Sequence, residues 1–377
     1  HCSPALFICD NIETINSSIP KSPGLTTLQL HQLLLDENLP TIYDPERKNK
    51  LIIATYVDDI LLDGEEAEVQ LLLERLKRRF KIKRISYLQQ GPLDFLGMTI
   101  LQYQEHIYLS MQSYIEKIVV DHQLSQRQTH TPITTENLDG NLLDARQTTF
   151  YQQLLGSLAW VAVNIRLDVR YAFLILGRKQ AKPTDTALTQ LLRTWAYLHT
   201  YKTLVISNHS DVPIRIFSDS NYLDNQLETS VGHVILLYGL PVTFRSSSPT
   251  IAKTNLLLSA QQGINSSTIA ELFALTECSH HLLQLSYLME ELCYPHHKPF
   301  TLFGDNTASL SFLSSHSNFR KRLKFLDVRQ NWLKALRYKG FLNYQHVPTD
   351  QNLADIFTKS LPRSTFSNLR DQMMVSL

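Results

Sequence analysis

The sequence predicts an α/β (α+β) protein with three parts: a small strand-rich segment, a helical middle and a layered α/β domain. Two short apolar strands flank Asp58-Asp59 within residues 51–62, and a helix follows them. Helical patterns then recur at 150–163, 168–178 and 186–199. From about residue 203 strands and helices mix, which is typical of a layered α/β domain.

The carboxy-terminal elements can be placed by their apolar patterns. Strands are expected at Thr203–Ser207, Pro213–Ser218, 232–238, 240–245, up to Gly304 and at 341–347. Helices are expected at 267–291, 306–314 and 325–338, with a last one after Asp350. We divide the chain into residues 1–110, 111–205 and 206–377. The second boundary lies within 200–212, where helical patterns give way to a mixture of strands and helices.

Composition excludes some classes of function. The chain has 377 residues, of which 43% are hydrophobic, so it can bury a substantial core. Its net charge of +1 does not by itself indicate a nucleic-acid binder. No apolar run reaches the roughly 18 residues of a membrane span, so no membrane partner is expected. The four cysteines, Cys2, Cys9, Cys278 and Cys293, form no C-x-x-C pair, which argues against zinc and favours a reducing compartment.

Asp58 and Asp59 are adjacent carboxylates between two apolar strands. Two-residue hairpin turns prefer Asn-Gly or Asp-Gly, because a type I′ turn needs positive φ at both central positions. Neighbouring carboxylates repel each other and lose solvation beside apolar residues, and a divalent cation relieves both costs. The pair therefore indicates either a metal site or a solvated acidic turn.

Four further acidic residues stand near the ends of separate elements. Asp219 ends a strand, Glu271 lies in the first turns of the long helix, Asp305 follows a strand, and Asp355 begins the last helical stretch. Carboxylates from separate elements can converge at one edge of a sheet, and a two-metal site for phosphodiester hydrolysis needs such a cluster. Each residue alone also fits a structural role, as a turn residue, an N-cap or a partner of a helix dipole.

Basic residues gather in two places. Arg75, Lys77, Arg78, Arg79, Lys81, Lys83 and Arg84 form one group, and Arg320, Lys321, Arg322 and Lys324 form the other. Contact with backbone phosphates is one interpretation of both groups, with Arg78 and Arg79 as the candidates in the first. A solvated helix end is the alternative for the first group. The second group favours phosphate contact, because it follows Asp305 within one helix.

Residues 56–62, Tyr-Val-Asp-Asp-Ile-Leu-Leu, resemble the YVDD box of reverse transcriptases of copia-type retrotransposons. Further stretches are similar to that family in the same order. Lys21-Ser22-Pro23 resembles the end of its LKQSP segment, and Phe95-Leu96-Gly97 resembles its primer grip. Gln112 and Tyr114-Ile115 resemble its Q-x-x-Y-I segment, and residues 155–172 resemble its GSLLYLATNTRPDIAYAV stretch. The resemblance covers about residues 15 to 370.

The carboxylates of the last part resemble the Asp-Glu-Asp-Asp set of ribonuclease H. The matching stretches are Ser218-Asp219-Ser220 to SDADW, Gly232-His233-Val234 to SGYV, 266–271 to SSTEAEY, Asp305-Asn306 to DNQSA, and 347–359 to VPTDENLADIFTK. The last stretch is the most specific in the chain.

The resemblance implies a fold and a chemistry for each part. Residues 1–110 correspond to a truncated reverse-transcriptase palm, 111–205 to a helical thumb and connection, and 206–377 to a ribonuclease H domain with a mixed sheet and flanking helices. Asp58 would bind Mg²⁺ for DNA synthesis, with Asp59 as its partner. Asp219, Glu271, Asp305 and Asp355 would hold Mg²⁺, or Mn²⁺, and cleave RNA in RNA–DNA hybrids.

The same resemblance implies partners and a location. The partners are the RNA–DNA hybrid, a template-primer and the rest of a Pol polyprotein. The location is the cytoplasm, in a virus-like particle, or the nucleus.

Departures from the family set further expectations. The fingers and the first catalytic carboxylate are expected to be absent, because Asp10 stands in the unrelated context Ile-Cys-Asp-Asn, so this chain alone should not polymerise DNA. The link between Phe244 and Ser266 is longer than usual, and Phe325 replaces a His. His346 is interpreted as a packed or edge residue.

Three functions remain open on the sequence. The first is a hybrid-specific endonuclease within a retrotransposon Pol polyprotein. The second is a degenerate relic that at most binds nucleic acid. The third is an unrelated Mg²⁺-dependent nuclease or integrase-like domain, against which the YVDD box argues.

Overall fold

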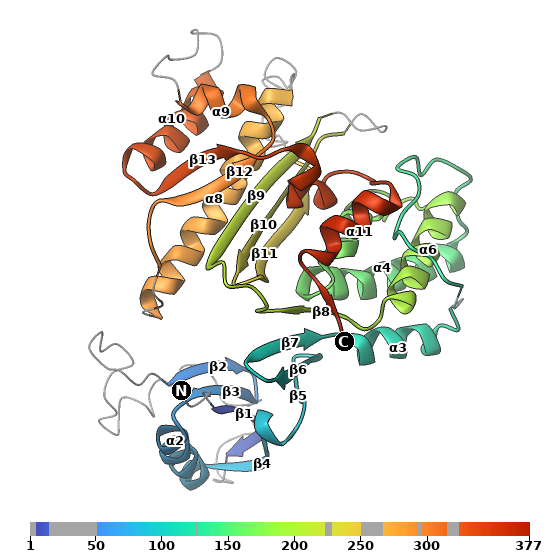
Figure 1. Cartoon of the computed structure of the whole chain (residues 1–377). Coiled ribbons are helices and arrows are strands. Elements are labelled where there is room, and N and C mark those ends of the chain that lie inside the picture. Colours follow the sequence, from blue (N-terminus) through green and yellow to red (C-terminus); the bar gives the residue numbers. More distant parts are fainter. Residues whose placement is uncertain are drawn as a thin grey trace. The chain divides into compact units, whose positions relative to one another are not determined.

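The computed structural model describes residues 5–14, 51–124, 127–222, 228–249, 267–292, 294, 296–314 and 324–377. The chain forms two compact units, His1–Ser110 and Met111–Leu377, and each is described by itself (Figure 1). The predicted α/β class is confirmed, since both units contain sheets and helices. Among the described helices, none combines the length and the apolar character that crossing a bilayer demands.

An antiparallel sheet dominates the first unit. Its strands are β1 (Ala5–Thr14), β2 (Ile52–Tyr56), β3 (Asp59–Gly64) and β4 (Phe80–Tyr87), in the order β2-β3-β1-β4. Helix α2 (Glu66–Arg79) buries an apolar stripe that packs with β3 and β4. Acidic residues in its first turn and basic residues in its last turn both suit the helix dipole.

The first unit ends in a short antiparallel ladder. After the 3₁₀ turn η1 (Leu88–Gln90), strands β5 (Leu93–Phe95), β6 (Met98–Tyr103) and β7 (His106–Ser110) pair in sequence. Leu88, Leu93, Phe95 and Ile100 form its small core.

The second unit begins with helices, as predicted for the middle of the chain. These are α3 (Gln112–Asp121), α4 (Ala145–Asn164), η2 (Leu167–Val169), α5 (Arg170–Arg178) and α6 (Asp185–Thr200). Local chemistry fixes two of the starts. Asp144 and Gln147 form a reciprocal capping box at α4, and the Thr184 hydroxyl accepts from the Ala187 amide at α6.

A five-stranded mixed sheet follows. Its strands are β9 (Ile214–Asn221), β10 (Ser230–Leu237), β11 (Leu240–Ser247), β12 (Phe300–Gly304) and β13 (Leu342–His346), in the order β11-β10-β9-β12-β13. The first three strands are antiparallel, whereas β12 runs parallel to β9 and β13. Tyr238 and Gly239 both have positive φ in the turn from β10 to β11, as a type I′ hairpin requires.

Helices flank this sheet, which confirms the mixed sheet with flanking helices predicted for this part. Helix α8 (Ser267–Glu291) packs on β9 and β10, with α9 (Thr307–Ser314) and α10 (Lys324–Tyr338) beside it. The 3₁₀ turns η4 (Thr349–Gln351) and η5 (Leu353–Phe357) follow β13, and η5 packs on β9 and β10. Cys278 of α8 lies fully buried in the core.

The chain end returns to the helices of the same unit, as the red segment in Figure 1 shows. Helix α11 (Arg363–Asp371) leads to strand β14 (Val375–Ser376), which pairs antiparallel with β8 (Leu204–Ser207). The strand predicted at 203–207 is therefore present, but β8 is not one of the five strands of the mixed sheet.

A buried charged network joins α11 to the helices. The Arg166 guanidinium donates through Nε and Nη2 to both oxygens of Asp168, at 3.0 and 2.7 Å. The Tyr197 hydroxyl donates to the same carboxylate at 2.7 Å, and Arg370 Nη1 of α11 reaches that hydroxyl at 3.3 Å. The side chains of Arg166 and Asp168 are fully buried.

The charge of this network is satisfied internally. Burial raises the pKa of Asp168, but Arg166 and Tyr197 outweigh burial and hold the pKa below its usual value. A depressed carboxyl pKa stabilises the folded state above pH 3.8, and this contribution is lost as pH falls through the folded pKa.

Removing the Asp168 charge should destabilise the second unit strongly. Asp168→Asn leaves the Arg166 guanidinium buried without a counter-ion, so we expect the free energy of unfolding to fall by about 3–5 kcal/mol. Denaturant unfolding measures the change. The double variant Arg166→Met/Asp168→Asn should lose less than the sum of the single variants, because the uncompensated charge is gone. A loss below about 1 kcal/mol for Asp168→Asn would contradict this role.

Gly232 marks the tightest approach of η5 to the sheet. A Cβ at this position would lie 2.5 Å from Phe357 Cβ and 2.9 Å from Thr358 Cγ2. We expect Gly232→Ala to destabilise the protein by about 1–3 kcal/mol through overpacking, measured by denaturant unfolding. Gly156→Ala is the control, because no atom lies within 4 Å and an alanine in α4 should stabilise it. Equal free energies of unfolding for the two variants would show that η5 moves to accommodate the added methyl group without loss of stability.

Candidate functional site

Three of the predicted carboxylates converge at one edge of the mixed sheet. Asp219 lies in β9, Glu271 in the first turns of α8, and Asp305 directly after β12. Oxygen atoms of the three side chains all lie within 4.8 Å of one another. Asp219 and Glu271 are buried and Asp305 is half-buried. The topology causes this meeting, because β9 and β12 are adjacent parallel strands and α8 packs on β9.

Asp355, the fourth predicted residue, adjoins this group from η5. Its side chain is buried and its charge raises the pKa of Asp219, as does that of Glu271. Its Oδ1 atom is buried without a hydrogen-bond partner among the described residues. The structure therefore brings all four predicted carboxylates of this part into one cluster, which we call the carboxylate cluster (Asp219, Glu271, Asp305 and Asp355).

Neighbouring polar groups fix the orientation of these carboxylates. Glu271 Oε1 accepts from the Ser220 amide at 3.2 Å and from its hydroxyl at 2.7 Å. The Thr358 hydroxyl donates to Asp219 Oδ2, and the Thr349 hydroxyl donates to Asp305 Oδ2 at 2.8 Å. Each of these donors contacts a single oxygen of its carboxylate, and the Thr358 hydroxyl also contacts the Asp355 carbonyl at 3.2 Å.

The turn that carries Asp355 is pinned from inside. Asn352 Nδ2 donates to the Ser218 carbonyl of β9 at 3.1 Å, and Asn352 Oδ1 accepts from the Ala354 amide at 3.2 Å. Asn352 is fully buried. It therefore caps η5 and fixes that turn beside Asp219.

Lys359 is the cation nearest the carboxylate cluster within the part of the chain that the structure describes. Its Nζ lies 2.9 Å from Asp355 Oδ2 and 3.9 Å from Asp219 Oδ2. Burial lowers the pKa of Lys359, but the two carboxylates outweigh burial and raise it. The lysine therefore stays charged and neutralises part of the negative charge.

The electrostatics of the cluster oppose ionisation of its acids. Burial raises the pKa of Asp219 well above its usual value, and the charges of Asp355 and Glu271 raise it further. Burial also raises the pKa of Glu271, to about 8, and that of Asp355. Four acids with one lysine thus form a site that favours additional positive charge.

Lys359, Thr358, Asn352 and Ser220 were not predicted as site residues. The first three lie in the stretch 347–359, which resembles VPTDENLADIFTK, so that stretch contained the signal. Ser220 directly follows Asp219, and only the packing of α8 reveals its bond to Glu271.

The Asp58–Asp59 hairpin of the first unit has a different geometry from the one expected. The turn consists of Val57 and Asp58, whereas Asp59 begins β3 and pairs with Tyr56. The positive φ of 55° falls on Val57, a conformation that β-branched residues rarely adopt. Asp58 and Asp59 are half-buried. Among the described side chains, no third acidic group joins them.

Strand β1 contains Asp10, which was not expected to serve as a third carboxylate of the polymerase site. Cys9 pairs with Ile60 of β3, and Asp10 pairs with Arg84 of β4. Because the strands are antiparallel, the backbone of Asp10 lies beside that of Asp59. The sequence context of Asp10 gave no indication of this neighbourhood.

The predicted nucleic-acid contacts fall partly on described residues. Arg78 and Arg79 lie in the last turn of α2 with exposed side chains. Arg320, Lys321 and Arg322 lie outside the described residues, and Lys324 is the first residue of α10. His346 is exposed on the edge strand β13.

The comparisons with known proteins agree with the motifs. A family described as reverse transcriptase (RNA-dependent DNA polymerase) matches residues 25–135. The Pol polyprotein of transposon RE1 from Arabidopsis thaliana is 25% identical over 87% of this chain. That of transposon TNT 1-94 from Nicotiana tabacum is 25% identical over 84%. The chain spans 22% and 24% of the length of these two relatives.

Two solved structures align with parts of the chain. LC11-RNase H1, isolated from compost, is 16% identical, with a TM-score of 0.28 and coverage of 38% of this chain and 89% of its own. A foamy viral protease-reverse transcriptase in complex with dsDNA is 15% identical, with a TM-score of 0.23 and coverage of 89% of this chain and 60% of its own.

The two transposon relatives cover 87% and 84% of the chain and therefore extend across both structural units. The family match includes the Asp58–Asp59 hairpin, and the relatives cover most of the chain. The resemblance to copia/Ty1-type retrotransposon Pol polyproteins is therefore confirmed: the chain is similar to a region of these polyproteins over most of its length, and its residues 25–135 match a reverse transcriptase family.

Proposed function

We propose that the second unit is a divalent-metal-dependent ribonuclease H that cleaves the RNA strand of RNA–DNA hybrids. The observation that carries the proposal is the convergence of Asp219, Glu271 and Asp305 within 4.8 Å, with Asp355 beside them. Phosphodiester hydrolysis by two metal ions requires such a set of oxygen ligands at the rim of a fold. The relatives support the assignment, since they are Pol polyproteins of transposons.

The cluster fits Mg²⁺ or Mn²⁺ by its donor set. All four side chains offer carboxylate oxygens, which these hard cations prefer. The buried Asp355 Oδ1, without a partner among the described residues, is an acceptor that a cation can satisfy. We propose Asp219, Glu271, Asp305 and Asp355 as the ligands.

The residues around the carboxylate cluster orient its carboxylates or compensate their charge. A bound divalent ion would activate a water molecule and stabilise the leaving oxygen. Ser220 holds Glu271 Oε1, and Thr349 holds Asp305 Oδ2, so each of these carboxylates has its second oxygen available as a ligand. Lys359 adjoins Asp355 and Asp219, where its ammonium offsets negative charge and reduces repulsion of a substrate phosphate.

We propose a second function for the first unit, as part of the palm for RNA-directed DNA synthesis. The family match over residues 25–135 and the Asp58–Asp59 hairpin favour it. In this proposal Asp58 binds Mg²⁺, Asp59 supports it, and Arg78 and Arg79 contact the template-primer. Among the described side chains no third acidic group joins Asp58 and Asp59, and we expect no DNA synthesis from this chain alone.

We propose a setting from the resemblance to retrotransposon polyproteins. The chain would act within a longer Pol polyprotein, in a cytoplasmic virus-like particle or in the nucleus. The alternative is a degenerate copy that binds nucleic acid at most. The two alternatives differ in one measurable property, cleavage by the folded chain.

Cleavage should depend on Asp219. With Mg²⁺ and an end-labelled RNA–DNA hybrid, the full chain should cut the RNA strand, and Asp219→Asn should reduce the rate at least about 100-fold by removing a metal ligand. Asp211→Asn is the matched control, because Asp211 is exposed and outside the cluster. Gel analysis of the labelled strand measures the rate. A folded chain that leaves the RNA intact would support the degenerate copy.

The metal-free protein should lose stability as pH rises. The raised pKa of Glu271 means that the folded state holds a proton that the unfolded state releases. This contribution is full below 4.5 and is lost as pH rises toward about 8. Bound Mg²⁺ replaces the protons, so its effect on the Tm should be larger above this interval than below it.

Thermal melts with Mg²⁺ and with a chelator measure this difference. Asp219→Asn should shrink the Mg²⁺-dependent rise in Tm, whereas Asp211→Asn should keep it. An equal Mg²⁺ effect at all pH values would contradict binding at the carboxylate cluster.

A further inference from the structure

We propose that a cavity between α5 and β11 binds a backbone phosphate of the nucleic acid held at the carboxylate cluster. This inference rests on the proposed function, because it assumes that the second unit binds a hybrid. It concerns affinity rather than chemistry. It adds Arg170 and Arg245, neither of which was predicted from the sequence, to the residues that contact nucleic acid.

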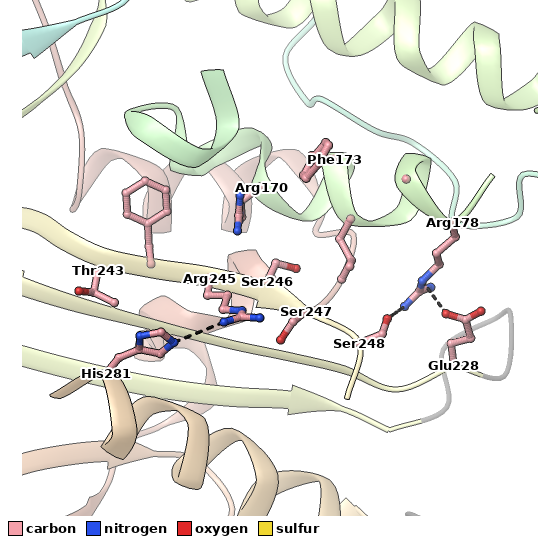
Figure 2. Close-up of a pocket in the computed structure, with 13 residues that line it drawn as sticks. Arg170, Phe173, Arg178, Glu228, Thr243, Arg245, Ser246, Ser247, Ser248 and His281 are labelled. Carbon is pink, nitrogen blue, oxygen red and sulfur yellow. Dashed lines mark hydrogen bonds and ion pairs between the residues drawn. The ribbon is translucent and has the colours of Figure 1, made fainter. Parts of the chain in front are cut away.

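The cavity has a volume of about 630 Å³ and opens along the edge strand of the mixed sheet. Arg170, Phe173 and Arg178 line it from α5, and residues 243–248 line it from β11 and the residue after it. His281 of α8 closes one end. Figure 2 shows Arg170 directed from α5 toward β11, where Arg245 and Ser246 lie.

Arg170 is the main reason to infer an anion. Its Nε and Nη1 atoms are buried, and neither has a hydrogen-bond partner among the described residues. Its guanidinium carbon lies 5.8 Å from the centre of the Phe173 ring, which limits how far the side chain can move. A buried donor without an acceptor is costly, and a phosphate oxygen supplies that acceptor.

Arg245 adds a second positive charge. Its side chain is exposed on β11, and its Nη1 lies 3.5 Å from His281 Nε2. Burial lowers the pKa of His281, and Arg245 lowers it further against the opposing effect of Glu277, so the imidazole stays neutral and adds no positive charge beside the arginine. Burial lowers the pKa of Arg170, and Arg245 adds to the effect, as expected for two cations side by side.

The acidic residues nearby are engaged elsewhere. Glu228 pairs with Arg178 Nε at 2.7 Å, and the Arg178 guanidinium also donates to the hydroxyls of Ser230 and Ser248. Glu277 accepts from the Ser247 hydroxyl at 2.9 Å. Two arginines thus face the single charge of Glu277 at this end, which keeps a net positive charge, while Glu228 compensates the end at Arg178.

The buried histidine next to the cavity responds to this potential. Burial lowers the pKa of His233 to about 3, and His281, Arg245 and Arg170 contribute to the shift. His233 and His281 lie with ring centroids 4.9 Å apart. Because burial is the main cause of this shift, His233 is neutral, and the net positive charge at this end is that of Arg170 and Arg245 reduced by Glu277.

Sheet register links the cavity to the carboxylate cluster. Ser246 pairs with Gly232, and Gly232 pairs with Asp219, so the three residues form one row across β11, β10 and β9. Two strand spacings of about 4.8 Å separate Ser246 from Asp219 by about 10 Å. A nucleic-acid strand covers this distance in about three nucleotides of 3.4 Å rise. Turn η5 covers this row at Gly232 and Ser246, so a hybrid that contacts both places has to pass around η5.

Arg170 is the first residue of α5 and is half-buried. Its buried Nε and Nη1 atoms make no hydrogen bond to the described residues, so Arg170→Ala removes no such bond at these atoms, and we expect the variant to fold.

Binding of a labelled RNA–DNA hybrid to the full chain tests the proposal. All variants carry Asp219→Asn so that the hybrid is not cut, and fluorescence anisotropy gives the Kd over a range of salt concentrations. Arg170→Ala should raise the Kd about 10-fold or more, as for loss of a charge-assisted contact. It should also reduce the slope of log Kd against log salt by about one phosphate contact.

Two further variants make the test specific. Arg245→Ala, an exposed change on the edge strand, should weaken binding in the same direction. Arg337→Ala in the last turn of α10 is the charge-matched control, because it precedes β13 whereas the cluster adjoins the far end of β12. It should leave the Kd within about twofold.

The outcomes separate the two proposals. An unchanged Kd and salt slope for Arg170→Ala and Arg245→Ala would overturn the phosphate site, whatever the cleavage assay shows. Weaker hybrid binding by both variants would support the phosphate site even if the chain that keeps Asp219 does not cleave the hybrid. If inorganic phosphate raises the Tm of the chain but not of Arg170→Ala, while hybrid affinity is unchanged, the cavity holds free anions and the proposal fails.

Discussion

The buried ion pair between Arg166 and Asp168 is the interaction on which the second unit depends. Tyr197 and Arg370 extend it into α11, so the chain end is held against helices encoded about two hundred residues earlier. The segment between β13 and α11 carries Asp355 and Lys359. A charge pair in the helical part therefore holds in place the residues that complete the carboxylate cluster on the sheet. Without its counter-ion the guanidinium would be buried alone, at a cost comparable with the stability of a whole domain.

The carboxylate cluster shows the opposite electrostatic design. At Arg166 and Asp168 opposite charges meet inside the protein, and the network is complete without a ligand. At Asp219 like charges are buried together, and Lys359 compensates them only in part. Glu136 reinforces the same segment, because its carboxylate accepts from the Ser360 amide at 2.8 Å and from the Tyr171 hydroxyl at 2.8 Å. Rigid support around an unsatisfied cluster is the arrangement expected of a site that gains a metal ion.

The cavity at Arg170 follows the same logic with the sign reversed. Two arginines share one end of it, and the nearby glutamates are engaged with Arg178 and Ser247. Both unsatisfied sites lie along one row of the sheet, the acidic one suited to cations and the basic one to phosphates. The phosphates of a hybrid attract both metal ions and arginines, so one hybrid suits both sites.

The sequence by itself determined the fold class and most elements, and it predicted the chemistry of the cluster, because apolar periodicity and the order of short motifs are local properties. It pointed to Asp219, Glu271, Asp305 and Asp355 as candidates, and it predicted all five strands of the mixed sheet. Only the tertiary structure decided which residues act together. The pairing of β8 with β14, the turn at Val57, the position of Asp10 beside Asp59, and the meeting of Lys359 with Asp219 join residues far apart in the chain or depend on backbone conformation. Arg166 and Asp168 stood in a recognised motif, yet their burial, and the absence of an acceptor for Arg170 among the described residues, arise from packing between elements that no local pattern records.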